Sequence, residues 1–202
     1  TILGDINQSI NPHSASAVDA IRNTFFQSTL LKLNKSYRST WEITQFAQQI
    51  QPDPELEAMK RYGDKPQIHH FRKNADALLF VADAALSLAD SDSQSLGIIC
   101  KTQKQAEKIA RQMQEQGVSY HLLSELSSSF SNGVVICTAH MAKGLEFDRV
   151  IVFDASEKNY QTTMDRHLLY VACTRAMHVL TLTVTGQAST LLPGEDYSEI
   201  RR

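Results

Sequence analysis

The chain has 202 residues, of which 42% are hydrophobic and 21% charged, and its formal net charge is −2. This composition is typical of a globular domain, and the charge excludes a broadly basic surface, so that nucleic-acid binding would need a local patch. No apolar run reaches the roughly 20 residues of a membrane span, and the first residues show no signal-peptide pattern. We therefore expect a cytoplasmic protein without a membrane partner.

The three cysteines are far apart in the sequence and form no Cys-x-x-Cys pair. They are Cys100, Cys137 and Cys173. Each lies in an apolar run, so we expect buried, reduced thiols, as is usual in the cytosol.

The first residues, 1–3, are similar to the end of an apolar strand, and a tight polar loop follows at 4–10. We therefore expect the chain to begin inside a larger protein. Apolar residues at positions 17, 18, 21 and 25 predict a helix over 14–26. Leu30, Leu31 and Leu33 predict a short strand before the segment 34–39.

Further along, short apolar runs alternate with amphipathic segments. Ser39 with Glu42, and Thr102 with Gln105, have capping-box spacing, and Gly117 suits a left-handed helix end. The predicted helices cover 39–50, 74–89, 102–117 and 164–177, and the predicted strands cover 68–71, 96–100, 118–122, 134–138, 149–154 and 179–184. This alternation predicts an α/β fold with a parallel sheet covered on both faces.

Two polar clusters in the first part of the chain could carry chemistry. In the first, Gly4 permits a sharp turn after a strand, and Gln8 offers a donor and an acceptor that can sense a phosphate or a water. In the second, Arg38 can hold phosphate oxygens with its planar guanidinium, and Tyr37 can stack on a flat ring. The plainer interpretations are an Asx-type turn with a surface glutamine, and a surface arginine beside a half-buried tyrosine.

A third cluster directly follows the apolar run 134–137, where an open α/β sheet can place a ligand site. Thr138 and His140 lie where they could contact a backbone phosphate. Gly144 lets the chain approach a ligand closely, and Glu146 could accept hydrogen bonds from sugar hydroxyls. A single histidine near a strand end often has only a structural partner, but so many polar residues together are unusual for a surface loop.

A fourth cluster lies in the predicted helix 164–177, whose residues are mostly apolar. Arg175 would project near the end of this packed element. Because a buried charge is costly without compensation, we expect it to have an anionic partner. That partner is either a ligand or an internal carboxylate.

In this order, the four clusters resemble the later motifs of superfamily-1 DNA helicases of the UvrD/Rep/PcrA type. Residues 4–10 (Gly-Asp-Ile-Asn-Gln-Ser-Ile) are similar to motif III, and residues 33–40 (Leu-Asn-Lys-Ser-Tyr-Arg-Ser-Thr) to motif IV. Residues 138–147 (Thr-Ala-His-Met-Ala-Lys-Gly-Leu-Glu-Phe) are similar to motif V, and 169–177 (Leu-Tyr-Val-Ala-Cys-Thr-Arg-Ala-Met) to motif VI.

The resemblance implies a RecA-like, P-loop NTPase-type three-layer domain with a mainly parallel central sheet, which binds ATP against another such domain. Residues 1–11 would be a remnant of the first motor domain, and 12–202 the second motor domain without a large accessory insertion. The implied catalytic residues are two arginine fingers and a phosphate sensor: Arg38, Arg175 and Gln8. The implied nucleotide ligands are Tyr37 on the adenine and Glu146 on the ribose, with Gly144 permitting the approach. Thr138 and His140 would face single-stranded DNA.

The chain departs from the family pattern in two ways. It contains neither a G-x-x-x-x-G-K-[ST] loop nor a Walker B run. The Mg²⁺ that accompanies ATP would then be held mainly by the first motor domain of the full-length protein. We expect no metal ligands in this chain and no ATPase activity from it alone. The interval 39–137 is also too short to contain the accessory domain of UvrD and Rep. In this respect the chain is more similar to the helicase IV/HelD branch.

The expected function is therefore the C-terminal motor domain of an ATP-dependent DNA helicase that acts on single-stranded or tailed duplex DNA. An alternative is an ATP-driven remodelling factor of HelD type that binds RNA polymerase. A third is a degenerate domain kept as a binding module, which the presence of Arg38, Glu146 and Arg175 disfavours.

Overall fold

The computed structural model describes residues 23–26, 29, 31, 34–124, 132–194 and 199–201. Within these ranges, seven strands form one sheet in the order β5-β6-β4-β7-β8-β3-β9, and neighbouring strands are parallel throughout. The strands are β3 (Gln67–Phe71), β4 (Ser95–Cys100), β5 (His121–Leu122), β6 (Gly133–Thr138), β7 (Phe147–Val152), β8 (Ala176–Thr185) and β9 (Glu199–Arg201).

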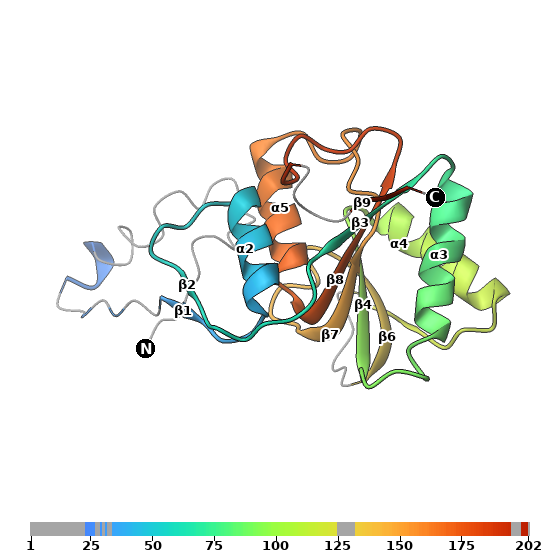
Figure 1. Cartoon of the computed structure of the whole chain (residues 1–202), viewed down its shortest axis with the longest axis horizontal. Helices are drawn as coiled ribbons and strands as arrows, with labels where there is room; N and C mark the ends of the chain where they lie inside the picture. The colour runs from blue at the N-terminus through green and yellow to red at the C-terminus, as the bar shows by residue number, and fades with distance from the viewer. Residues whose placement is uncertain are drawn as a thin grey trace.

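Helices cover both faces of this sheet (Figure 1). On one face α2 (Trp41–Ile50) and α5 (Thr163–Cys173) enclose a core that includes Phe46, Phe147 and Leu169. On the other face α3 (Asn74–Leu86) and α4 (Gln103–Glu115) enclose a second core around Ile98 and Ile109. This three-layer arrangement confirms the predicted α/β fold. Two short strands, β1 (Lys35–Ser36) and β2 (Glu57–Ala58), form a separate parallel pair beside α2.

The boundaries of α4 confirm both signals that the sequence offers. Thr102 and Gln105 form a complete capping box at its start. At its end Gly117 has a φ of +69°, and the amides of Gly117 and Val118 donate to the carbonyls of Gln114 and Met113 (3.2 and 2.9 Å). This is a Schellman ending. Because it uses Val118, the following strand is shorter than the predicted 118–122 and comprises only β5.

The predicted cap at Ser39 is wrong by one residue. Thr40 is the N-cap of α2, and its hydroxyl accepts from the amide of Ile43 at 3.5 Å. Ser39 instead donates to the carbonyl of Ala176 at 2.6 Å, and Glu42 accepts from the amide of Gly63 at 2.9 Å. In α3 the first residue is Asn74, as the predicted helix 74–89 has it, and the N-cap is Lys73.

The predicted helix 164–177 is also wrong at its end, because α5 stops at Cys173 and β8 begins at Ala176. The hydroxyl of Thr174 and Nε of Arg175 both donate to the carbonyl of Val171, at 3.0 and 3.1 Å. These bonds satisfy a carbonyl group at the helix end, where no further helical amide is present to do so. The apolar residues beyond them belong to a buried strand, which helical periodicity alone cannot distinguish.

The three cysteines lie in the two hydrophobic cores as free thiols, as expected. Burial raises the pKa of Cys137 to about 12 and raises the pKa values of Cys100 and Cys173 well above the usual range. These thiols therefore remain protonated and unreactive near neutral pH.

The predicted loop at 4–10 lies outside the described residues, as does most of the predicted helix 14–26 and of the strand 30–33. In the ranges that are described, no helix has the length and apolar character that crossing a membrane requires.

A buried ion pair joins the start of α5 to the end of β4. Nζ of Lys101 lies 2.5 Å from Oδ1 of Asp165, whose side chain is 8% exposed. Oδ2 of Asp165 accepts from the amides of Gln161 and Thr162, both at 3.0 Å. Burial by itself raises the pKa of Asp165. The hydrogen bonds from Lys101 and from these amides outweigh that effect and lower the pKa to about 2.

Asp165→Asn should therefore remove a pH-dependent contribution to stability. Because the folded pKa of about 2 lies below the ordinary 3.8, the ionised carboxylate stabilises the fold above about pH 4 and loses this effect as the pH falls toward 2. We expect the free energy of unfolding in urea to fall by about 2 kcal/mol at pH 7, and by about half as much at pH 3. Asp76→Asn, at an exposed first-turn position of α3, is the matched control. An equal fall in the free energy of unfolding at pH 7 and at pH 3 would contradict the lowered pKa of Asp165.

Candidate functional site

The connection between β6 and β7 runs the full length of the sheet. Both strands flank β4 and are parallel to it. Thr138, at the end of β6, pairs with Cys100 at the end of β4, whereas Arg149 in β7 pairs with Leu96 near the start of β4. At about 3.3 Å per residue, Thr138 and Glu146 lie about 20 Å apart along the strands. The residues expected to face DNA and those expected to face nucleotide are therefore at opposite ends of the sheet.

Thr138 and His140 lie at the carboxyl end, in a tight turn. The carbonyl of Thr138 accepts from the amide of Ala142 at 2.9 Å, and its hydroxyl accepts from the amide of Met141 at 3.4 Å. The amide of Ala139 donates to the carbonyl of Cys100 at 3.0 Å, which holds the turn against β4. The side chain of His140 is exposed at this turn. Thr138, at the same edge, is partly exposed.

Gly144 allows the chain to leave this turn toward the other end of the sheet. Its φ is +89°, in the left-handed region that favours glycine. A Cβ atom at this position would meet nothing within 4 Å. Glycine is therefore favoured here by the backbone conformation and not by a lack of space for a side chain.

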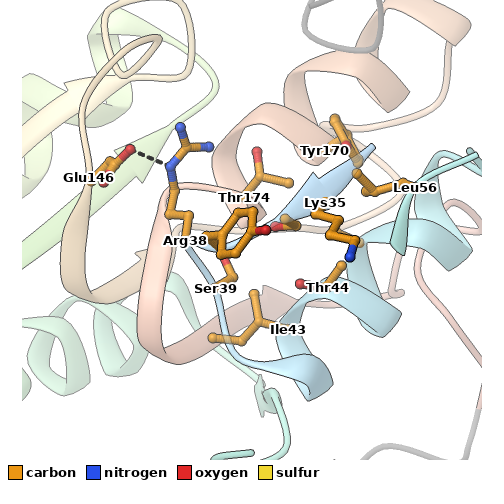
Figure 2. A pocket seen from close by; sticks show the side chains of 12 residues that line it. Lys35, Arg38, Ser39, Ile43, Thr44, Leu56, Glu146, Tyr170 and Thr174 are labelled. Atoms are coloured by element: carbon orange, nitrogen blue, oxygen red, sulfur yellow. Dashed lines mark hydrogen bonds and ion pairs between the residues drawn. The ribbon is translucent and has the colours of Figure 1, made fainter. Parts of the chain in front are cut away.

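Tyr37, Arg38 and Glu146 line one pocket at the amino end of the sheet (Figure 2). The pocket has a volume of about 520 Å³ and lies between α2, the end of α5 and the β1–β2 pair. Lys35 adds a second cation to its wall, and Ile43 and Ala47 add apolar surface. The sequence placed Tyr37 and Arg38 more than a hundred positions from Glu146, and the fold brings all three together.

Arg38 and Glu146 form an ion pair through Nε and Oε1, drawn as a dashed line in Figure 2. Their side chains are 34% and 43% exposed, so this pair contributes at most about 1 kcal/mol to stability. It can therefore open at little cost when either partner meets a stronger ligand. The ring of Tyr37 is 66% exposed and free to stack on a planar group.

Three consecutive carbonyls fix the segments that form this pocket. The carbonyl of Arg175 accepts from the amide of Phe147 at 3.0 Å. The carbonyl of Ala176 accepts from the hydroxyl of Ser39 at 2.6 Å, and that of Met177 accepts from the amide of Thr40 at 3.2 Å. The segments similar to motifs IV, V and VI thus meet where α5 ends and β8 begins.

The side chain of Arg175 is fully buried and does not line the pocket. Its guanidinium donates to the carbonyls of Val171 (3.1 Å) and Leu145 (3.3 Å) and to the hydroxyl of Thr174 (3.2 Å). Neutral oxygens therefore solvate at least part of the charge that we expected an anion to balance. Thr174, next to Arg175 in the chain, does line the pocket.

Gln8 lies outside the described residues. Arg61, which no sequence pattern singled out, lies in the polar, proline-containing connection after α2. Nη2 of Arg61 donates to the carbonyl of Arg38 and, at 2.9 Å, to that of Met177. An exposed arginine in such a connection gives no sequence signal, because its role depends on carbonyls that only the fold brings near.

Arg175→Ala should destabilise the domain far more than Arg38→Ala. It removes the donors to two backbone carbonyls inside the protein and leaves a cavity, which together cost about 2–4 kcal/mol. Arg38→Ala removes only a half-exposed ion pair and should cost less than about 1 kcal/mol. Urea unfolding of both variants measures the two values. Equal, small losses would contradict the buried position of Arg175.

Comparison with known proteins places the chain among helicase domains. Two family models, both described as the UvrD-like helicase C-terminal domain, match residues 31–127 and 133–183. A search of curated proteins found no match. The crystal structure of the C-terminal domain of a possible DNA helicase from Lactobacillus plantarum WCFS1 is 33% identical, with a TM-score of 0.66 over 77% of this chain and 91% of that one.

The C-terminal domain of the DEAD-box protein Dbp5 is 16% identical, with a TM-score of 0.51 over 68% of this chain and 88% of that one. At this identity the likeness concerns the fold alone. The sheet and its two helical layers are those of RecA-like helicase domains. With a relative at 33% identity that this chain covers almost completely, the conclusion is direct: the chain belongs to the family of UvrD-like helicase C-terminal domains.

Proposed function

We propose that this chain is the second motor domain of an ATP-dependent DNA helicase and that it supplies part of the sites for ATP and single-stranded DNA. The observation that carries this proposal is the shared pocket of Tyr37, Arg38 and Glu146 at the amino end of the sheet. Family membership supports the helicase class. The pocket supports the position of the nucleotide. The proposed domain division remains 1–11 for the first motor domain and 12–202 for the second.

The pocket residues fit the parts of a nucleoside triphosphate. The exposed ring of Tyr37 offers a stacking surface for the adenine. The guanidinium of Arg38 suits phosphate oxygens, and the carboxylate of Glu146 can accept from ribose hydroxyls. A volume of about 520 Å³ is also within the usual range of ligand pockets. The Arg38–Glu146 pair would open on binding, when each side chain exchanges its partner for a group of the nucleotide.

Phosphoryl transfer would need groups from both motor domains, and this pocket would supply those of the second domain. ATP would supply the phosphoanhydride bond, and Mg²⁺ would balance its negative charge. The loop that cradles the phosphates would come from the first motor domain of the same protein, because this chain has no Walker A or B sequence. Arg38 would stabilise charge on the γ-phosphate only when the two domains close, a contribution of about 10³–10⁵ in rate.

Arg175 would need a rearrangement to act as the second arginine finger. Its guanidinium would have to leave the carbonyl of Leu145 and cross the turn from the buried side to the side where Thr174 lines the pocket. We propose that closure against the first motor domain provides the anion that favours this movement. Gln8 would couple the same phosphate to the DNA site.

Thr138 and His140 would contact single-stranded DNA at the carboxyl end of the sheet. Their turn is exposed at His140 and is joined to β4 by the hydrogen bond from the Ala139 amide to the Cys100 carbonyl. Because the net charge of the chain is near zero, we expect weak DNA binding by this domain alone.

The alternative function is an ATP-driven factor of HelD type that remodels RNA polymerase. The observation that favours it is the short interval between Arg38 and Thr138. The described residues of this interval form the elements α2 to β5 of this domain and their connections. Unwinding of a tailed duplex by the complete protein would support the helicase function. Co-purification with RNA polymerase, without unwinding, would support the alternative.

In the complete helicase, Arg38→Ala should lower ATP turnover by about 10³-fold or more while single-stranded DNA binding is retained. Arg38→Lys should restore little, because an amino group cannot make the planar two-pronged contact. Lys104→Ala, at an exposed position of α4 on the other face of the sheet, is the matched control. Phosphate release measures turnover. Wild-type turnover in Arg38→Ala, or clear turnover by the 202-residue chain alone, would refute the proposal.

Thr138→Val or His140→Ala should weaken DNA stimulation of the ATPase and leave basal turnover nearly intact. Loss of one phosphate contact of about 1–2 kcal/mol corresponds to a roughly 5- to 30-fold higher DNA concentration for half-maximal stimulation. His178→Ala, an exposed histidine near the opposite end of the sheet, is the control. An equal loss of basal and stimulated turnover would show that these two residues do not serve the DNA site.

A further inference from the structure

Arg61 joins the segment that carries Arg38 to the central sheet. It lies in the connection between β2 and β3, and its Nη2 donates to the carbonyls of Arg38 and Met177. Its own carbonyl accepts from the amide of Trp41 at 2.8 Å. One residue thus contacts the main chain just before α2, the first turn of α2 and the start of β8.

We propose that Arg61 is a positioning residue that holds the main chain of Arg38 so that its guanidinium is aimed at the phosphates of the nucleotide. This inference rests on the proposed function. It assigns to the connection after α2 a role in turnover that neither its composition nor its exposure suggests.

The main chain of Arg38 needs this support because few other contacts hold it in place. Residues 37–40 belong to neither a helix nor a strand, and β1 before them comprises only Lys35 and Ser36. Ser39 and Thr40 are fixed to β8, but both follow Arg38. The ion pair with Glu146 cannot hold Arg38 in the nucleotide-bound state, because nucleotide would replace it. Arg61 contacts the Arg38 carbonyl itself and leaves the side chain free.

Arg61 has little importance for the fold as a whole. Its side chain is exposed and reaches carbonyls at the protein surface, where water can replace a lost donor. Its bond to Trp41 is a main-chain bond and survives any substitution of the side chain. A large effect on turnover would therefore come from geometry and not from unfolding.

The geometry also predicts which substitution is tolerated. Both bonds come from a single nitrogen, Nη2, so that the planar fork of arginine is not needed. A lysine ammonium has three donors on one nitrogen and can bridge the same two carbonyls. Methionine has a similar length and no donor. Arg61→Lys should thus preserve the support, and Arg61→Met should remove it.

The test uses the complete helicase with saturating single-stranded DNA, and measures kcat and KM for ATP. Arg61→Met should lower kcat about tenfold to a hundredfold, the effect of misplacing a catalytic group by about 1 Å. KM should change by less than about threefold, because the lost interaction acts mainly in the transition state. Arg61→Lys should regain most of the rate. Lys60→Met, at the adjacent exposed cation, should behave as wild type.

A double-mutant cycle with Arg38→Ala tests whether Arg61 acts by positioning Arg38 or has an effect of its own on turnover. If Arg61 acts through Arg38, Arg38→Ala/Arg61→Met should be no slower than Arg38→Ala alone. An undiminished further loss would mean that Arg61 acts independently and would overturn the inference. Wild-type kcat in Arg61→Met, together with slow turnover in Arg38→Ala, would also overturn the inference. The proposed function would stand in that case. Wild-type kcat in Arg38→Ala would reject the proposed function itself. Thermal unfolding midpoints within about 3 °C of wild type exclude misfolding as the cause.

Discussion

The carbonyl groups of Arg175, Ala176 and Met177 hold the candidate site together. Ala176 and Met177 begin β8, and Arg175 directly precedes it. At this end β8 is paired with β7 through Ala176 and Phe147, whereas its pairing with β3 starts only at Thr181. Their hydrogen-bond donors belong to the two segments that carry Glu146 and Arg38. The charged groups of the pocket therefore take their positions from the point where α5 ends and β8 begins, although both lie on irregular segments.

Arg175 links this anchor to Glu146 in a second way. Its guanidinium donates to the carbonyl of Leu145, just before Glu146, and its own carbonyl accepts from the amide of Phe147, just after it. Glu146 is thus clamped on both sides by one residue. Any movement of the Arg175 side chain toward a phosphate releases the preceding carbonyl and loosens the segment of Glu146. The proposed arginine finger and the proposed ribose ligand cannot change position independently.

Periodicity and capping signals were enough to predict the three-layer fold, because each α/β unit buries its own apolar face. The capping box at Thr102 and the left-handed glycine at Gly117 were correct because local hydrogen bonds form them. The equally spaced pair of Ser39 and Glu42 was wrong because Ser39 donates to the distant carbonyl of Ala176 instead. The end of α5 was wrong because the apolar residues of β8 continue the helical spacing. The side chains of Arg61 and Arg175 could not be placed from sequence, since their partners are carbonyls that lie far away in the chain or depend on how a helix ends.

The connection between the two ends of the sheet is short and contains two consecutive turns. From Thr138 to Phe147 the chain must advance about 20 Å along the strands and cross two strand spacings, a distance of about 22 Å. The amide of Ala142 closes a first turn on the carbonyl of Thr138, and the amide of Leu145 closes a second turn on the carbonyl of Ala142 at 3.0 Å. The second turn ends at Leu145, whose carbonyl accepts from Arg175. A ligand that displaces the turn at Thr138 would therefore act on the segment of Glu146 through a continuous series of hydrogen bonds. Coupling between the two ends would run through these two turns and the clamp at Arg175, without a change in the sheet.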